Sequence, residues 1–346
     1  MRACNRILTI LFVLVFAFSV WPQEQPFESN VSKRGTTAAP FLEIGAGARA
    51  LAMGSAFVAL ADDPTTIYWN VGGLAKLPKH AVSFTHIEWA ADTRFDYIAA
   101  SFKVGSFGTI GVSFTNFGLG EMQVRTVAEP EGTGQFFNGN DAALNLAYAR
   151  NLTDNFAIGL AAKFIRQSIW DMSANAFAVD VGVHYQLPFK GFTLGAAMSN
   201  FGTSMKMNGD NNLILHDPDP LHGGNNGRIP AELQMESWAL PLNFQVGVAY
   251  QAFNTDNHRM LVAVDALHPN NNYESMNVGA EYVFNQFIAL RGGYQSLFLT
   301  DSEESFTFGF GIQREFVGDV RLALDFAYAD FGRLQNSKAI SLLIEF

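Results

Sequence analysis

The sequence is poor in cysteine, in charge and in long apolar runs, and each absence excludes a class of protein. Its 346 residues contain one cysteine, Cys4, in a segment that we expect to be removed, so we expect no disulfide and no thiol chemistry in the mature chain. Charged residues make up 16%, against roughly 25% in an average soluble protein. After residue 20 no run reaches the roughly 18 apolar residues that a membrane-spanning helix needs, which excludes a polytopic helical membrane protein.

Sequence signatures of catalysis and cofactor binding are missing as well. There is no HExxH, GxSxG or Walker A motif, so we expect neither an enzyme nor a cofactor. A formal net charge of −10 without a basic run argues against nucleic acid as a partner. One loop groups His216, Asp217, Asp219 and His222, which could bind a divalent metal. Because their spacing matches no defined ligand motif, we favour a polar surface loop and expect no metal site.

The N-terminal residues are typical of a secretory signal. Arg2 and Arg6 precede an apolar stretch over residues 7–20, and near its end Ala17 and Ser19 offer small residues for the −3 and −1 positions of a cleavage site. We therefore expect a signal peptide over residues 1–22; an uncleaved anchor helix is the alternative. Export of a chain without disulfides fits a bacterial envelope protein.

From about residue 80 onward, large apolar residues recur at every second position. Over residues 177–185, side chains such as Phe177 alternate with small or polar ones such as Asp180, and three further stretches repeat the pattern: 142–149, 242–250 and 320–328. The second face is too small and too sparsely charged for the water-facing side of a soluble sandwich. The alternation is typical of a transmembrane β-barrel, in which lipid-facing and lumen-facing side chains alternate.

The alternating segments number fourteen, with centres near residues 85, 99, 112, 146, 161, 181, 196, 247, 264, 279, 291, 309, 324 and 343. The stretch 121–127 also alternates, and we interpret it as the third strand running past the membrane, because single-chain bacterial barrels have even strand counts. Short connections are expected at 105–107, 151–155, 188–191, 254–258, 285–286 and 317–319. Long ones are expected at 117–140, 168–174, 200–241, 268–273, 296–304 and 330–338, with one short exception at 90–94.

These patterns predict an all-β protein. Its main part, residues 79–346, is expected to be a fourteen-stranded antiparallel transmembrane β-barrel in the bacterial outer membrane, with periplasmic N and C termini. Residues 23–78 differ, and we expect a lead followed by a short helical hatch or plug. Leu51, Met53, Phe57 and Leu60 have helical spacing, which Asp62-Asp63-Pro64 ends. A rim cap on the periplasmic side is the alternative to a plug.

Strand parity points several charged or titratable side chains into the lumen. They are Lys103, Lys163, Asp180, His184, Asp265, Glu281, Arg291, Arg321, Asp325 and Glu345. Apart from the histidine, four are positive and five negative, and balanced charges in a confined space are expected to pair with one another. No ring of one sign is visible, so the sequence gives little support for an ion-selective porin.

The segment Ile44–Pro64, continued by Tyr68-Trp69-Asn70-Val71-Gly72-Gly73-Leu74-Ala75, resembles the N-terminal signature of the PorV/PorQ family of outer-membrane barrels, within the FadL-like superfamily. The family's Trp-Asn-Pro-Ala-Gly-Leu appears here as residues 69–74 without its proline. The resemblance implies a plug in the periplasmic mouth of a fourteen-stranded barrel. The residues expected to form or gate it are Arg49, Met53, Phe57, Asp62, Asp63, Trp69, Asn70 and Gly73.

Two functions follow from the resemblance. The superfamily implies a barrel that passes hydrophobic small molecules across the outer membrane. The closer family implies a component of the type IX secretion system that binds or shuttles secreted cargo, through the loops at 117–140 and 200–241. Expected partners are outer-membrane lipid, the hydrophobic ligand or the secretion subunits and cargo, and the barrel-assembly machinery. The machinery would read the C-terminal strand, whose alternating apolar stripe ends at Phe346.

Overall fold

Fourteen antiparallel strands close into a barrel in the computed structural model, which describes residues 33–346 except 61, 225, 300–301 and 335. The expected signal peptide and residues 23–32 of the expected lead lie outside the described residues. The barrel strands are β1 (Ala81–Glu88), β2 (Arg94–Val104), β3 (Gly108–Gly118), β6 (Gly139–Asn151), β7 (Phe156–Ile169), β8 (Met172–Gln186), β9 (Phe192–Gly202), β13 (Asn243–Asn254), β14 (His258–Pro269), β15 (Ser275–Phe284), β16 (Ile288–Leu297), β17 (Phe306–Phe316), β18 (Val320–Ala329) and β19 (Ser337–Glu345).

The first and last strands pair with each other and complete the ring. β1 pairs with β2 on one side and with β19 on the other, in a register that sets Ala81 opposite Glu345. All fourteen centres expected from the sequence fall within these strands, so the predicted barrel is confirmed. Because the ring of described strands is closed, no barrel strand presents an unpaired edge to lipid. There each unpaired backbone N–H or C=O group would cost roughly several kcal/mol.

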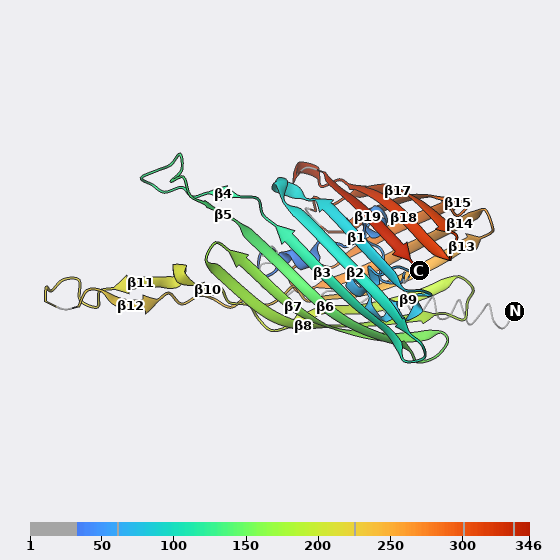
Figure 1. The fold of residues 1–346 in the computed structure, drawn as a ribbon, viewed down its shortest axis with the longest axis horizontal. Helices are drawn as coiled ribbons and strands as arrows, with labels where there is room; N and C mark the ends of the chain where they lie inside the picture. Colours follow the sequence, from blue (N-terminus) through green and yellow to red (C-terminus); the bar gives the residue numbers. More distant parts are fainter. Residues whose placement is uncertain (1–32, 61, 225, 300–301, 335) are drawn as a thin grey trace, which may run out of the picture. The chain divides into compact units, whose positions relative to one another are not determined.

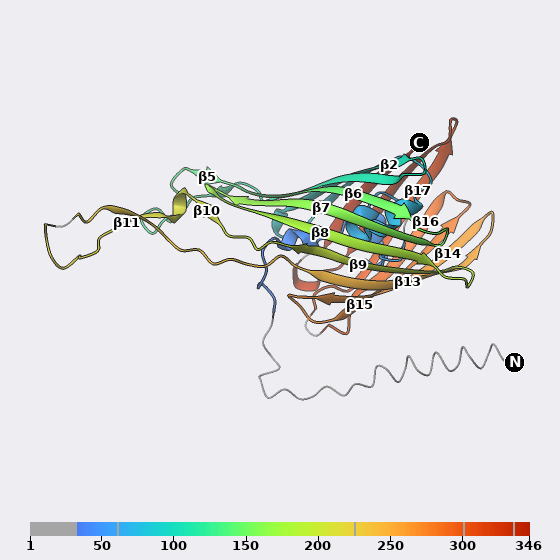
Figure 2. The same cartoon turned by 90° about the horizontal axis from the view of Figure 1, so that it is seen from below.

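Further short strands lie in the two longest connections. β4 (Met122–Gln123) pairs with β5 (Phe136–Phe137), and β11 (Leu213–His216) pairs with β12 (Ile229–Glu232). β10 (Asn208–Gly209) adds to β8. Both hairpins lie beyond the ends of the barrel strands (Figures 1 and 2). The stretch 121–127 is therefore part of a separate loop hairpin and not a continuation of the third strand.

One connection expected to be long is a tight turn. β7 ends at Ile169 and β8 begins at Met172, and these two residues pair directly, so residues 168–174 form a hairpin instead of a loop. Trp170 occupies the turn with φ 50°, a left-handed conformation that a tight hairpin requires. Because the turn lacks glycine or asparagine at this position, the sequence carries no turn signal there.

The two faces of the barrel differ as the alternation predicts. Outward side chains such as Phe177 and Leu146 are about two-thirds exposed, at 65% and 62%, while their neighbours Ala178 and Ala147 are buried. Aromatic pairs such as Phe192–Tyr250 and Phe308–Tyr328 stack across neighbouring strands of the outer face. An apolar outer face with aromatic residues is what a lipid-facing barrel wall needs.

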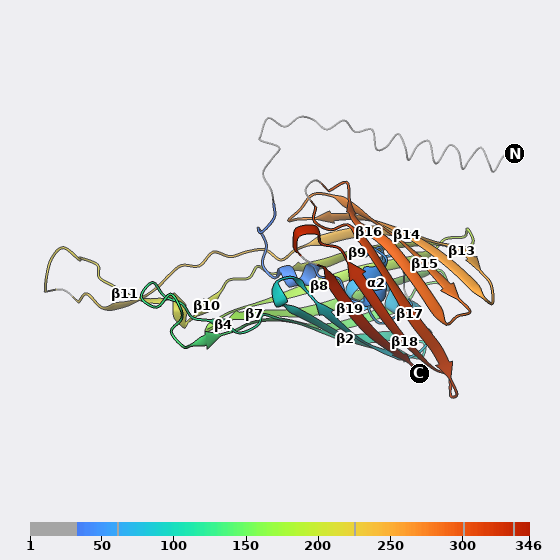
Figure 3. The same ribbon diagram turned by 90° about the horizontal axis from the view of Figure 1, so that it is seen from above.

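Residues 40–77, which we call the luminal segment, form four short helical pieces. These are η1 (Pro40–Glu43), α2 (Ala48–Ala52), α3 (Thr66–Trp69) and η2 (Val71–Lys76); three further 3₁₀ turns lie in connections, namely η3 (Ala90–Asp92), η4 (Asp210–Asn212) and η5 (Gly332–Leu334). Among the described residues, no helix combines the length and apolar character that a membrane crossing requires. Figure 3 shows α2 close to β17 and β19.

The helix expected to continue to Leu60 ends at Ala52. Gly54 and Ser55 have φ of 63° and 60°, which breaks the right-handed helix. The following residues turn because their backbone N–H groups bond to the wall: Gly54 donates to Thr307 and Phe57 donates to Asp265. The spacing of apolar residues could not show that wall side chains would bond these backbone N–H groups in place of the helix.

Candidate functional site

The luminal segment passes through the barrel from the long-loop end to the short-turn end. The residues just before the segment are held at the long loops, where the Ala38 N–H donates to the Ala239 carbonyl at 2.9 Å. Its trailing side reaches the short turns, where the Lys76 ammonium donates to the Asp154 carbonyl at 2.8 Å. The first described residues therefore lie at the end opposite the C terminus, where the Phe346 N–H donates to the His80 carbonyl.

Glycines on the inner wall allow the backbone of the segment to lie against the strands. A Cβ on Gly293 would lie 2.2 Å from the Gly54 nitrogen, and one on Gly279 would lie 2.1 Å from the Met53 carbonyl oxygen. On the opposite arc, a Cβ on Gly182 would lie 2.2 Å from the Asn70 amide oxygen. No side chain fits at these distances, so the glycine-rich inner face is shaped to the segment.

A network of charges joins the segment to strands β15, β16 and β18. Arg49 donates through Nε to Glu281 at 2.7 Å, and Arg291 donates to the same Glu281 oxygen at 2.7 Å. Arg291 also donates to Asp325 at 2.7 Å, and Arg259 lies 3.0 Å from Glu281. The Glu281 side chain is fully buried, so three guanidinium groups neutralise one carboxylate out of contact with water.

Two carboxylates of the segment face the same arginine with opposite consequences. Burial opposes ionisation of Asp62, but Arg49, 2.5 Å away, outweighs it and lowers the pKa of that carboxyl. Asp63 is 3.6 Å from Arg49, and burial there prevails and raises its pKa to about 6. Asp63 accepts hydrogen bonds from the backbone and hydroxyl of Thr65. Asp62 is therefore ionised at neutral pH, whereas Asp63 titrates at about pH 6.

Asp265 on β14 holds the turn after α2. One carboxylate oxygen accepts the N–H groups of Phe57 at 2.7 Å and Val58 at 2.9 Å, and the side chain is completely buried. Two adjacent N–H groups directed at one oxygen form a strong, charge-assisted contact. The alternation of the strand predicts that Asp265 faces the lumen, but it does not predict that Asp265 meets Phe57 and Val58.

Asn70, Trp69 and Gly73 form a turn fixed by side-chain bonds. The Asn70 amide donates to the carbonyls of Val58 and Val183 and accepts from the Gly72 N–H. The Trp69 indole donates to the Ala46 carbonyl at 2.8 Å, and the Gly73 N–H donates to the Asn70 carbonyl. The asparagine therefore links two parts of the segment to β8.

The remaining residues expected in the segment lie in an apolar cluster. Met53 and Phe57 are fully buried together with Trp69. The guanidinium carbon of Arg49 lies 5.4 Å from the centre of the Phe57 ring, a cation–π geometry. All eight residues expected to form or gate the plug are therefore packed in the luminal segment.

The other residues expected to face the lumen lie in separate places. Lys163 lies 2.9 Å from Asp180 and donates to the Asn200 side chain, forming a second buried pair on β7 and β8. Arg321 lies 3.1 Å from Glu345. His184 is buried against the segment, and Lys103 is exposed at the strand end. The alternation of the sequence therefore predicts which charged side chains share the inner face of the barrel, but not which of them form ion pairs.

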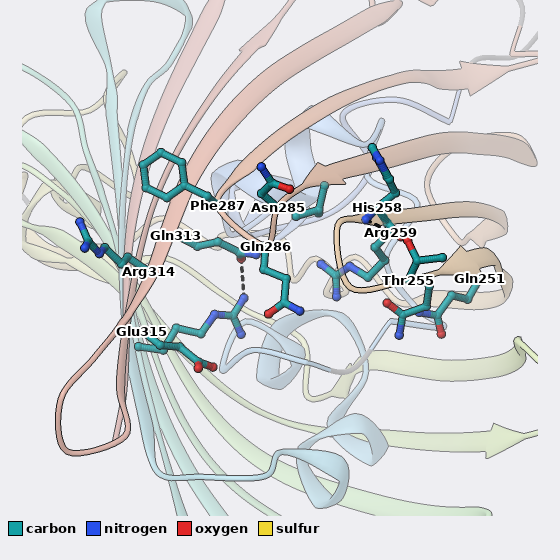
Figure 4. A pocket seen from close by; sticks show the side chains of 13 residues that line it. Gln251, Thr255, His258, Arg259, Asn285, Gln286, Phe287, Gln313, Arg314 and Glu315 are labelled. Carbon is teal, nitrogen blue, oxygen red and sulfur yellow. Dashed lines mark hydrogen bonds between the residues drawn. The ribbon is translucent and has the colours of Figure 1, made fainter.

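Two cavities lie on either side of the segment. The long-loop cavity, of about 440 Å³, is lined by Leu42, Leu51, Trp69, Gln245, Leu267 and Gln295, among others. The short-turn cavity, of about 700 Å³ (Figure 4), is lined by Gln251, His258, Arg259, Gln313 and Arg321, among others. Beside Arg49 and Asp63, only about 30 Å³ of space remains.

Sequence reasoning missed the uncharged polar groups of this site. Thr307 bonds both the Gly54 N–H and the Ala52 carbonyl, and Ser341 accepts from the Ala48 N–H at 2.7 Å. Gln295 donates to Ser55. These side chains share strand parity with the inward charges, so the same alternation could have identified them.

Comparison with known proteins agrees with this architecture. No curated protein sequence matches the chain. The fold is similar to the toluene transporter TbuX of Ralstonia pickettii, with 12% identity over 87% of this chain and 97% of that one and a TM-score of 0.53. It is also similar to the toluene transporter TodX of Pseudomonas putida, with 11% identity over 87% and 97% and a TM-score of 0.52. A third similar structure is the monoaromatic hydrocarbon channel CymD, with 10% identity over 88% and 98% and a TM-score of 0.52.

Because the sequence identity is low, these likenesses establish the barrel fold alone. The family assignment rests on sequence. The model of the PorV family, described as type IX secretion system protein PorV, matches residues 27–216, which is more than half of the chain. The chain therefore belongs to the PorV family of outer-membrane β-barrels.

Proposed function

We propose that the protein is a closed outer-membrane barrel of the type IX secretion system, which engages secreted protein at its long-loop end and has no catalytic role. The observation that carries the proposal is the attachment of the luminal segment to the wall. Its bonds reach β8 through Asn70, β14 through Asp265, β15 through Arg49, and other strands through Thr307 and Ser341. A segment bound on all these sides suits a plugged barrel better than an open channel.

The proposal includes an orientation and a division of the chain. We expect the long loops outside the cell, with the short turns and the C terminus in the periplasm. The luminal segment would act as the hatch, after a signal peptide over 1–22 and a lead, and before the barrel at 79–346. Because Ala38 is bonded at the long-loop end, we propose that the chain enters the barrel from that end.

Assembly and membrane contact follow from the last strand. Ile340 and Leu342 on β19 and Phe346, directly after its end, expose an apolar stripe, at 51%, 40% and 51%. We propose that outer-membrane lipid covers this stripe in the finished barrel. During assembly the barrel-assembly machinery would read the same strand before it pairs with β1.

A second candidate function is the passage of hydrophobic small molecules. The long-loop cavity favours it, because a volume of about 440 Å³ lies in the range of small-molecule sites and Leu42, Leu51 and Leu267 contribute apolar surface. Structures of similar fold are described as transporters of toluene or channels for monoaromatic hydrocarbons. In this case the segment would have to move to open a path.

A deletion strain separates the two functions. We expect loss of this chain to abolish secretion of type IX cargo, measured in the culture supernatant, and to leave growth on toluene or long-chain fatty acids unchanged. A plasmid copy should restore secretion. Normal secretion with lost uptake would refute the secretion function and support transport.

A further inference from the structure

The long-loop cavity has a wall of uncharged amide side chains that the closed-barrel function leaves unused. It lies between the luminal segment and the inner faces of β9 and β13 to β16. Asn243 and Gln245 come from β13, Asn277 from β15 and Gln295 from β16, all at inward positions. A cavity for a hydrocarbon would instead be lined almost wholly by apolar groups.

Gln295 is the most informative of these side chains. It is 6% exposed, and its Nε2 donates to the Ser55 hydroxyl at 2.6 Å, while its Oε1 is buried without a partner among the described residues. Since Ser55 bonds only one end of the amide, either orientation of the group leaves one terminal atom unpaired. A buried amide group without a hydrogen-bond partner is destabilising, so its presence beside a cavity points to a ligand that pairs with it.

Asn243 on β13 has the same feature. Its Oδ1 is also buried without a partner among the residues that the structure describes. Two unpaired carbonyl oxygens call for a ligand that carries N–H donors. A hydrocarbon has none, and the carboxylate of a fatty acid offers only acceptors at neutral pH.

The charges at the cavity argue against an ionic ligand. The charged residues of its lining are Arg34, Glu43, Lys163, Glu303 and Glu304. Lys163 lies 2.9 Å from Asp180, Glu303 pairs with Arg333, and the carboxylates of Glu43 and Glu304 accept from Asn271 and Ser296, so these groups have partners within the protein. The indole ring of Trp69 offers little open surface to the cavity, because Trp69 is 6% exposed and packs on Tyr68 with ring centres 4.9 Å apart.

We propose that the long-loop cavity binds an extended, uncharged polypeptide segment, whose backbone N–H groups donate to Gln295 and Asn243. Leu42, Leu51 and Leu267 would receive its small apolar side chains. The proposal rests on the secretion function and refines it, since it names a stretch of secreted polypeptide as the occupant and the cavity as its place.

The test uses the purified full-length chain in detergent and two probes. One is a pool of acetylated, amidated heptapeptides randomised over Gly, Ala, Ser, Thr and Val; the other is laurate. Bound probe is measured by mass spectrometry after gel filtration. We expect the wild type to retain peptides, and Gln295→Met and Asn243→Leu each to reduce retention about tenfold, the effect of one lost buried hydrogen bond.

Gln251→Met, at the short-turn cavity, is the matched control and should retain peptides as the wild type does. Each variant is first checked for the gel shift of a folded barrel, and Gln295→Asn serves if Gln295→Met does not fold. Equal peptide retention by the wild type and the cavity variants, or retention of laurate alone, would overturn the proposal. Lost secretion in the deletion strain together with absent peptide retention would refute only the cavity, whereas retained peptides with normal secretion would refute only the secretion function.

Discussion

At the scale of single residues, Glu281 connects the barrel wall to the luminal segment. It stands directly opposite Arg291 in the β15–β16 register and also accepts from Arg49 of the segment. Among the described residues, the fully buried carboxylate is compensated by these two guanidinium groups and by Arg259. Removal of its charge would leave three arginines close together with Asp62 and Asp325 as their nearest remaining carboxylates, which is more costly than removal of a surface ion pair.

We expect Glu281→Gln to lower the free energy of unfolding by about 3–5 kcal/mol, the usual cost of breaking a buried ion pair. Urea unfolding in detergent, followed by tryptophan fluorescence, measures this. Glu315→Gln is the control, because Glu315 is exposed on β17 and should change stability by less than about 0.5 kcal/mol. Equal stability of the two variants would contradict the assigned role of Glu281.

Asp63 should give the segment a pH dependence. Because burial raises its folded pKa to about 6, above the usual value of 3.8, the protonated form is favoured in the folded state. Its contribution to stability is complete below about pH 4 and is lost as the pH rises through about 6, by up to roughly 3 kcal/mol. Thermal unfolding of the wild type and of Asp63→Asn, compared at pH 4 and pH 7.5, measures this.

The comparison between the two proteins isolates Asp63, since Asp62 is present in both and its lowered pKa acts in the opposite direction. The stability difference between wild type and Asp63→Asn should change between the two pH values. A difference that stays constant would show that Asp63 does not titrate in this range.

At the scale of elements, the fit between wall glycines and the luminal segment determines whether the segment stays inside. Gly293 faces inward, with no room for a Cβ beside Gly54, whereas an added Cβ on Gly292 would meet nothing closer than 3.9 Å. Gly293 and Gly292 are consecutive on β16 and face opposite sides. They therefore form a natural pair for substitution.

We expect Gly293→Leu to displace the segment while the barrel still folds, because the added side chain would overlap the backbone at Gly54. Trypsin should then cleave after Arg49, whose side chain is only 11% exposed in the wild type, and mass spectrometry detects the fragment. Gly292→Leu should remain uncut at this site. Protection of Arg49 in both variants would show that the segment does not depend on this contact.

The loop hairpins should be separable from the barrel. In the part of the loop that the structure describes, β11 and β12 form a two-stranded sheet of their own, and Leu213, Leu215 and Leu221 are 62%, 61% and 89% exposed. Replacement of residues 210–235 by a short glycine-serine linker should therefore leave heat resistance unchanged and reduce cargo secretion by about tenfold or more, measured in the culture supernatant. Normal secretion by this variant would exclude the hairpin from cargo engagement.

The sequence predicts the strands better than the contacts between them, for physical reasons. Alternation is local, so it identifies all fourteen strands and the inward parity of Glu281, Arg291 and Asp325. The meeting of Glu281 with Arg49 depends on register and on the path of a segment 232 positions away, which no local pattern contains. The same limit explains the helix that was expected to reach Leu60 and the loop expected at residues 168–174.

At the scale of the whole molecule, the described chain forms a ring of strands filled by its own N-terminal segment, with a cavity on each side of the segment. Such a closed barrel should resist denaturation by detergent. We expect the unboiled protein to migrate differently from the boiled protein on a detergent gel. Identical migration would be inconsistent with a closed barrel.

The most direct test of the account is the ionic conductance of the purified full-length chain in a planar lipid bilayer. If the luminal segment closes the barrel, the wild type should show no stepwise conductance, while Gly293→Leu and a variant lacking residues 40–77 should show repeated steps. Gly292→Leu should behave as the wild type. Wild-type steps as large as those of the variant without the segment would contradict the account, because the lumen would then be open with the segment in place.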